Sequence, residues 1–248
     1  LLANDVRFIF VRVNTVTHRI RCVVVLSPQY IEQRFGRFGK PTVKQQMIIT
    51  PKARLTVLAR KPPILFYPDL PQVRSLLGTP EKKKGQIRDA PIPGHIRPLK
   101  DLLRLVEKFV LGTRLPSAST KNRGQALESL ISGLLGYETG GLVGGYQDIV
   151  REALEVKVQD AATVDLGRFS SQFEEPIASC PGFTTRSIRY LIALTNAESG
   201  LIEGVVLAPG ALLGDHFAFV ADSSFKSQRS IPMSFFDALE GKSVFNPS

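Results

Sequence analysis

Two periods of apolar and polar residues run along the chain, and the shorter one predicts strands. Within residues 6–26, Val, Ile and Phe alternate with polar side chains in two runs, "VRFIFVRVNTV" and "HRIRCVVVLS", which predict paired strands. Residues 28–36 predict a short helix, and the segments "QQMIIT" and "RLTVLAR" predict further strands. Residues 61–98 hold many prolines and the run "EKKKGQIRDAPIPGHIRP", which predicts irregular structure.

The helical period dominates the middle of the chain. Leucine and valine recur every three or four residues in "LKDLLRLVEKFVL" and "NRGQALESLISGLLG", and Gly136 is a natural stop for the second helix. The segments "SIRYLIALTNA", "GVVLAPG" and "HFAFVA" then predict strands, and "SIPMSFFDALEG" predicts a short terminal helix. This order predicts an α/β core with a mixed sheet at residues 96–248, preceded by a β-rich region at residues 1–95.

Composition narrows the class of protein. The chain is 43% hydrophobic and 22% charged, as in ordinary globular proteins, and no run of about 18 apolar residues predicts a membrane-spanning helix. The first residues carry charges within their apolar run and lack a small-residue cleavage site, so we expect no signal peptide. Cys22 and Cys180 are isolated, which favours a reducing cytoplasm, and the three histidines are too far apart to suggest a metal site.

The net charge of +10 is unevenly distributed. Residues 1–125 hold 24 Lys and Arg against seven Asp and Glu, whereas residues 126–248 hold eight against 15. The basic half predicts a surface for a polyanion such as nucleic acid, although a solvated basic surface is the alternative. Eight cations are the candidate phosphate contacts, four on the first predicted sheet and four in the proline-rich segment, where a loop could embrace DNA: Arg7, Arg12, Arg19, Arg21, Lys82, Lys83, Lys84 and Arg88.

The acidic half contains a strand with charges on one face. In "LEVKVQ", Glu155, Lys157 and Gln159 share one face, and the three apolar side chains share the other. Asp148 precedes Glu155 by seven residues, so a short reversal around residues 151–152 would bring it alongside. Two carboxylates can share a hard cation such as Mg²⁺, and a lysine beside them can act on an attacking water. The same pattern also fits a solvated strand face with an ion pair along it.

Glu128 lies at the margin of the second helix's apolar stripe. A carboxylate half-turned toward a core is costly unless it has a partner. The sequence therefore leaves two interpretations: a surface glutamate whose stem lies on the edge of the stripe, or an additional acid of the Asp148–Glu155 cluster.

With "QD" at residues 147–148, "EVK" at residues 155–157 and a preceding helix that carries Glu128, residues 100–220 resemble the PD-(D/E)xK nuclease superfamily. The resemblance implies a restriction-endonuclease-like core of a helix, three strands, a helix and a further strand near residues 187–196. It also implies that Asp148 and Glu155 bind Mg²⁺, that Lys157 acts on the attacking water, and that Glu128 is an accessory acid. Gln147 replaces the proline of the family motif, and Gln159 is a candidate supporting group behind the metal ligands.

The size and the basic β-rich extension most resemble the type II restriction endonucleases. That branch implies a cytoplasmic, sequence-specific cutter of double-stranded DNA that works as a homodimer, with no membrane partner. Two alternatives remain open: a structure-specific repair or junction-resolving nuclease of the same superfamily, and a non-catalytic nucleic-acid-binding protein. The chain shows no P-loop, dinucleotide fingerprint or nucleophile elbow.

Overall fold

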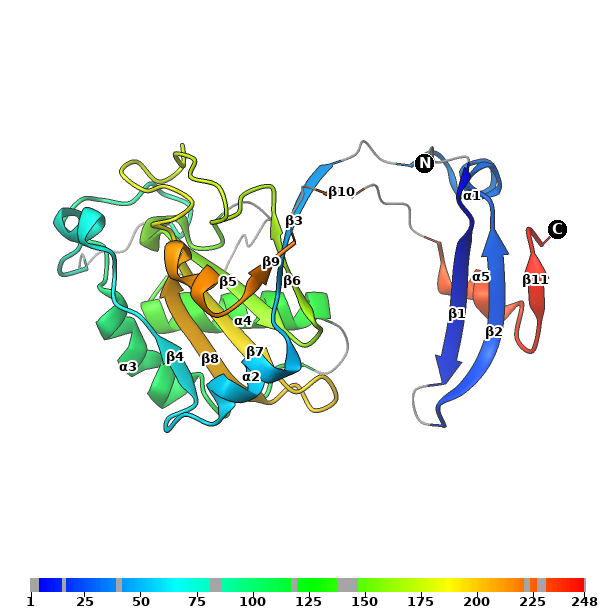
Figure 1. Ribbon diagram of the computed structural model, residues 1–248, viewed down its shortest axis with the longest axis horizontal. Coiled ribbons are helices and arrows are strands. Elements are labelled where there is room, and N and C mark those ends of the chain that lie inside the picture. Colours follow the sequence, from blue (N-terminus) through cyan, green and yellow to red (C-terminus); the bar gives the residue numbers. More distant parts are fainter. Residues whose placement is uncertain are drawn as a thin grey trace. The chain divides into compact units, whose positions relative to one another are not determined.

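A computed structural model of the chain (Figure 1) describes residues 5–14, 17–38, 42–80, 86–116, 120–137, 147–220, 224–226 and 231–247. The chain forms two compact units. The first consists of Leu1–Val43 and Phe225–Ser248, and the second of Lys44–Ser224. The candidate phosphate contacts Lys82, Lys83 and Lys84 lie outside the described residues.

The first unit contains a three-stranded sheet in the order β1-β2-β11. β1 (Phe8–Asn14) is antiparallel to β2 (Arg19–Leu26), and β11 (Ser243–Phe245) pairs with β2 in parallel. One face of the sheet packs against α1 (Pro28–Phe35) and α5 (Met233–Asp237), around a small core of Cys22, Val24, Leu26, Ile31 and Phe236. The predicted pair of strands, the short helix after them and the terminal helix are confirmed.

The second unit is built on a mixed sheet in the order β4-β8-β7-β5. β5 (Leu154–Gln159) and β7 (Arg189–Thr195) are parallel, β8 (Ile202–Pro209) is antiparallel to β7, and β4 (Ile64–Phe66) is parallel to β8. The helices α3 (Leu99–Phe109) and α4 (Thr120–Leu135) pack on one face through buried side chains that include Leu99, Val106, Leu127 and Ile131. β5 is therefore an edge strand with α4 against it (Figure 1).

The opposite face of this sheet is covered by α2 (Pro51–Leu58) and by a second sheet. That sheet contains β3 (Thr42–Ile48), β6 (Thr163–Gly167), β9 (Ala218–Phe219) and β10 (Ser224–Lys226). Met47, Ile49, Val164 and Leu166 are buried in the same cluster as Tyr190 and Ile192 of β7. The expected α/β class with mixed sheets is confirmed.

Three expectations about the fold need correction. The segment "RLTVLAR" belongs to α2 and not to a strand, because Thr50 caps this helix by accepting from the Ala53 amide at 3.2 Å and Pro51 is its first residue. The boundary at residue 95 is also wrong, since β4 lies within the proline-rich stretch and extends the sheet of the second unit. Residues 160–188, all described, contain no helix, in contrast to the core that the nuclease resemblance implies.

Two further observations concern the whole described chain. The cysteines Cys22 and Cys180 are both buried free thiols. A helix with the length and apolarity to cross a bilayer does not occur in the described parts of the chain.

Candidate active site

A tight reversal positions Asp148 beside β5. Ile149 and Leu154 exchange backbone hydrogen bonds of 3.0 and 3.1 Å, and a 3₁₀ turn at Val150–Glu152 lies between them. Ala153 closes the turn with a left-handed backbone at φ 47°. The reversal expected around residues 151–152 is thus present, and it returns the chain so that Asp148 lies next to the strand that carries Glu155.

Asp148, Glu155 and Lys157 meet at the outer edge of β5. The Lys157 ammonium is 3.3 Å from Asp148 Oδ2 and also forms an ion pair with Glu155 Oε1. The backbone links the carboxylates as well: the Val156 amide donates to Asp148 Oδ2 at 2.8 Å, and the Asp148 amide donates to Glu155 Oε2 at 3.2 Å. The alternation in the sequence thus predicted a shared face for Glu155 and Lys157, and the structure brings all three charged groups together.

Burial controls the protonation of this cluster. The Glu155 side chain is 2% exposed, and desolvation raises its pKa to about 8, an effect that Lys157 opposes and Asp148 reinforces. For Lys157, burial lowers the pKa, but the attraction of Glu155 and Asp148 outweighs burial and raises it above its usual value. We conclude that the Lys157 ammonium stays charged, and that Glu155 is the member of this ion pair that exchanges a proton near neutral pH.

Glu128 is half-buried on α4 and belongs to the same electrostatic environment. Burial, the charge of Asp148 and the opposing charge of Lys157 together raise its pKa to about 7, and burial is the largest of these effects. Leu127 and Ile131 on the same helix are buried against the central sheet, so the helix turns Glu128 toward the margin of the apolar stripe, as predicted. Of the two interpretations of Glu128, its coupling to Asp148 and Lys157 favours the additional acid.

Gln147 takes the place of the proline that the family motif would have. It is 3% exposed, and its Oε1 accepts from the Cys180 thiol at 2.9 Å and from the Ser179 hydroxyl at 3.3 Å. Burial raises the pKa of Cys180 to about 12, which keeps this thiol protonated and able to donate. Hydrogen bonds to the segment before β7 thus fix the entry to the turn, where the motif would use a proline ring.

Gln159 contacts a different part of the second unit. Its side chain accepts from Arg54 of α2, and its amide donates to the Ala161 carbonyl. Arg54 also donates to the Thr195 carbonyl at 3.0 Å and to Glu203 at 2.7 Å. These contacts place Gln159 in the attachment of α2 to the end of the sheet, rather than behind the carboxylates of the cluster as expected.

A buried network of ion pairs, which the sequence pattern did not predict, includes Glu152 of the turn that follows Asp148. Arg189, which is 1% exposed at the start of β7, lies 3.4 Å from Glu152 and 3.6 Å from Asp69. Glu152 also accepts from the Tyr137 hydroxyl and from the Arg97 amide, both at 3.0 Å. The sequence did offer one signal for this network, which is an arginine directly before the apolar run of β7. A charged side chain next to buried strand positions is rarely buried without a partner of opposite charge.

Further contacts of Arg189 and Asp69 tie the network to α3. Arg189 donates to the Arg97 carbonyl, and Asp69 accepts from the Leu99 amide at 2.7 Å, at the start of that helix. The backbone amide of Arg189 donates to the Ala153 carbonyl at 3.1 Å. Arg189 and its partner Asp69 together therefore connect the start of α3, the start of β7 and the turn that follows Asp148.

The candidate phosphate contacts of the first sheet are only partly available. Arg12 forms an ion pair with Asp237, and Arg21 forms one with Glu240, both within the first unit. Arg7 is exposed and donates to the Val6 carbonyl at 2.8 Å, and Arg19 is exposed. Arg88 is exposed in the second unit. Two of the four sheet arginines thus have carboxylate partners that the sequence pattern did not reveal.

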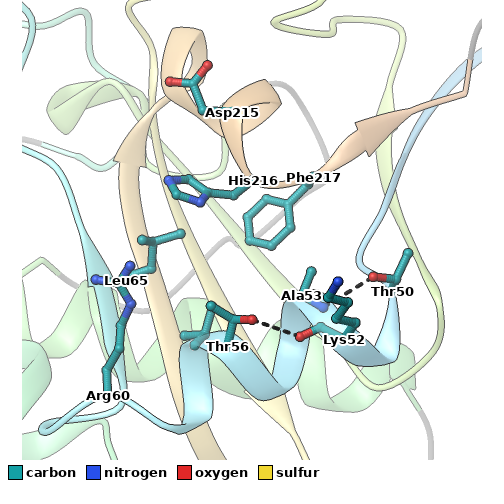
Figure 2. A pocket seen from close by; sticks show the side chains of 10 residues that line it. Thr50, Lys52, Ala53, Thr56, Arg60, Leu65, Asp215, His216 and Phe217 are labelled. Atoms are coloured by element: carbon teal, nitrogen blue, oxygen red, sulfur yellow. Dashed lines mark hydrogen bonds between the residues drawn. The ribbon is translucent and has the colours of Figure 1, made fainter.

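A cavity of about 340 Å³ lies elsewhere in the second unit, beside α2 (Figure 2). Its polar lining includes Lys52, Arg60 and His216, and the Nε2 of His216 is 2.6 Å from the Tyr67 hydroxyl. In Figure 2 the Thr56 hydroxyl is bonded to the Lys52 carbonyl, and Thr50 caps the helix. The acidic residues of the Asp148–Glu155 cluster do not line this cavity, so the two features are separate.

The cluster offers oxygen donors of the kind that Mg²⁺ prefers. Among the described residues, no group of three His, Cys, Asp or Glu side chains is arranged to hold a metal ion. Asp148 and Glu155 nevertheless both form ion pairs with the Lys157 ammonium. A carboxylate as buried as that of Glu155 requires a positive charge nearby. The donor chemistry fits Mg²⁺, which would share these oxygens with Lys157.

Comparison of the chain with family models, with curated proteins and with solved structures gave no match in any of the three.

Proposed function

We propose that this protein is a Mg²⁺-dependent endodeoxyribonuclease. The observation that carries the proposal is the convergence of Asp148, Glu155 and Lys157 on the edge of β5, with the Lys157 ammonium between two carboxylates. The net charge of +10 supports a polyanionic substrate, and the first unit alone carries ten Lys and Arg against four Asp and Glu.

Each residue of the cluster has a chemical task in this proposal. Asp148 and Glu155 hold Mg²⁺, which when bound stabilises charge on the phosphoryl oxygens and activates water. Lys157 places a positive charge beside the attacking water and the scissile phosphate, where it favours loss of the water's proton and stabilises the developing negative charge. Glu128, half-buried with a raised pKa, can accept or return a proton at the margin of the site.

The narrower proposal is sequence-specific cutting of double-stranded DNA by a homodimer, as the resemblance to type II restriction endonucleases implies. A two-fold dimer would read a palindromic site. The alternatives differ in their products. A structure-specific nuclease would cut branched or damaged DNA in preference to plasmid, and a binding protein without catalytic activity would retain DNA without cutting it.

The test is cleavage of supercoiled plasmid with Mg²⁺, repeated with EDTA. Asp148→Asn, Glu155→Gln and Lys157→Met are expected to lower cleavage by several orders of magnitude while DNA binding persists. Two exposed residues of α3 provide matched controls, Glu107→Gln and Lys108→Met, which should leave cleavage unchanged. Discrete fragments from a sequenced plasmid would support specific cutting. Wild-type activity in any of the three cluster variants would remove that residue from the proposed site.

A further inference from the structure

Among the described strands, β1 pairs with β2 alone, and its other edge forms one wall of an apolar groove in the first unit. β1 is the outermost strand of the β1-β2-β11 sheet (Figure 1). A groove of about 420 Å³ is lined by five consecutive residues of this strand, together with Met233 and Phe236 of α5. Consecutive strand residues point to opposite faces, so a groove that contacts all five must wrap around the edge that β2 does not occupy.

The exposed side chains along this edge are apolar. Ile9, Val11 and Val13 are 66%, 49% and 45% exposed, and Met233 is 59% exposed. The one charged residue in the strand, Arg12, is directed to Asp237 on α5. An unpaired strand edge with an uncharged, β-branched face is the feature that natural sheets usually protect. This edge therefore has the character of an interface and not of a surface for DNA phosphates.

We propose that β1 pairs with β1 of a second copy of this chain, antiparallel about a two-fold axis at Val11. In this register, Val11 lies opposite Val11 of the second copy, and Ile9 lies opposite Val13 of the second copy. The pairing uses all seven residues of the strand, and the exposed β-branched side chains form three cross-strand pairs on one face. The two three-stranded sheets then form one continuous sheet.

Charge selects this register over its neighbours. With the axis at Val11, each Arg12 lies opposite Phe10 of the other copy, whereas an axis at Arg12 would place the two guanidinium groups opposite one another. An odd offset would place Ile9 opposite Arg12 and Val11 opposite Phe10, so the exposed apolar side chains of the two copies would no longer share one face of the sheet. The strand sequence FIFVRVN is thus compatible with itself in one full-length antiparallel register.

The size of the edge predicts a weak dimer. Edge-to-edge pairing covers the backbone edge and only the flanks of the four exposed apolar side chains, so the contact is smaller than the roughly 1,200 Å² of a stable interface. Backbone hydrogen bonds between the strands add to this contact. We therefore expect a monomer–dimer equilibrium that depends on protein concentration.

Cross-linking of the full chain tests the pairing. Directly opposite residues of antiparallel strands are about 4.5–5.5 Å apart at Cα, within the range that a disulfide spans. Val11→Cys, oxidised with copper phenanthroline, should give a covalent dimer on a non-reducing gel. Cys22 and Cys180 are buried, so the native thiols should not compete. Ile20→Cys is the matched control, because Ile20 is 64% exposed on β2, away from the edge.

Sedimentation of lysine variants gives an independent readout. Val11→Lys opposes two ammonium groups at the axis and should raise the dimer dissociation constant at least about tenfold, whereas Ile20→Lys should leave it unchanged. Both positions are exposed, so circular dichroism should show a native fold. A wild-type chain that remains monomeric at high concentration would overturn the proposal. Equal cross-linking of Val11→Cys and Ile20→Cys would also overturn it, because it would indicate stacking of sheet faces.

Discussion

Replacing Arg189 by methionine should strongly destabilise the second unit. Methionine has a similar length, so the change removes the charge and its hydrogen bonds without leaving a large cavity. Glu152 and Asp69, with side chains 3% and 7% exposed, lose their shared cation. Breaking a buried ion pair by removing one partner costs about 3–5 kcal/mol.

The remaining partners of the two carboxylates set the expected value within that range. Glu152 keeps its bonds from Tyr137 and from the Arg97 amide, and Asp69 keeps the Leu99 amide. Two carboxylates lose their cation together, but each retains a donor, so we expect a loss of about 4 kcal/mol in the free energy of unfolding. With a urea m-value of about 2 kcal/mol/M, the midpoint should fall by about 2 M.

Urea unfolding followed by circular dichroism measures this change. The matched control is Arg104→Met, which removes a 3.2 Å ion pair with Asp101 at a side chain that is 72% exposed. An exposed pair contributes at most about 1 kcal/mol, so the control should barely move the midpoint. A loss below about 1 kcal/mol in Arg189→Met would refute the reasoning, because it would mean that Glu152 and Asp69 are solvated or neutral without the arginine.

Three other predictions concern the proposed nuclease. Because the raised pKa values of Glu155 (about 8) and Glu128 (about 7) mean that protons compete with metal, Mg²⁺ affinity measured by titration calorimetry should fall from pH 9 to pH 6. The fall should be about 100-fold if the protonation of Glu155 alone competes with the metal, and a flat profile would exclude Glu155 as a ligand. Glu128→Gln should lower plasmid cleavage less than Glu155→Gln does, and activity equal to wild type would favour a surface role. Replacing Lys82, Lys83, Lys84 and Arg88 together should weaken binding to all DNA sequences similarly and flatten its salt dependence. An unchanged slope would instead assign the phosphate contacts to the arginines of the first sheet, Arg7, Arg12, Arg19 and Arg21.

The sequence predicted the local geometry of the candidate site well. Strand alternation is a property of the backbone, so the shared face of Glu155 and Lys157 followed directly from their spacing. The separation of seven positions between Asp148 and Glu155 suits a tight reversal, and the structure contains one. The helical period of α4 similarly predicted Glu128 at the margin of the stripe.

Contacts between distant segments were beyond the same reasoning. Arg12 and Asp237 are 225 positions apart in the sequence, and Arg189 and Glu152 are 37 positions apart. No local sequence pattern predicts an ion pair between residues that are so far apart. In α2, the cap at Thr50 and the proline after it overrode the strand preference of the apolar segment that follows. The sequence therefore predicted the helices and strands, and the charged residues that share a face of one strand. It did not predict which charged side chains form ion pairs with distant segments.

The hydrogen bond from the Val156 amide to Asp148 limits which residues can replace Asp148 during evolution. β5 is the last strand of its sheet, and the Val156 amide points away from β7. Without Asp148 this amide would be an open donor, to which a strand of another molecule could form a hydrogen bond. Asp148 thus shields the sheet against self-association besides serving the proposed chemistry. A lineage that lost the activity would still gain by keeping an acceptor at this position, so asparagine is a more permissible replacement than alanine.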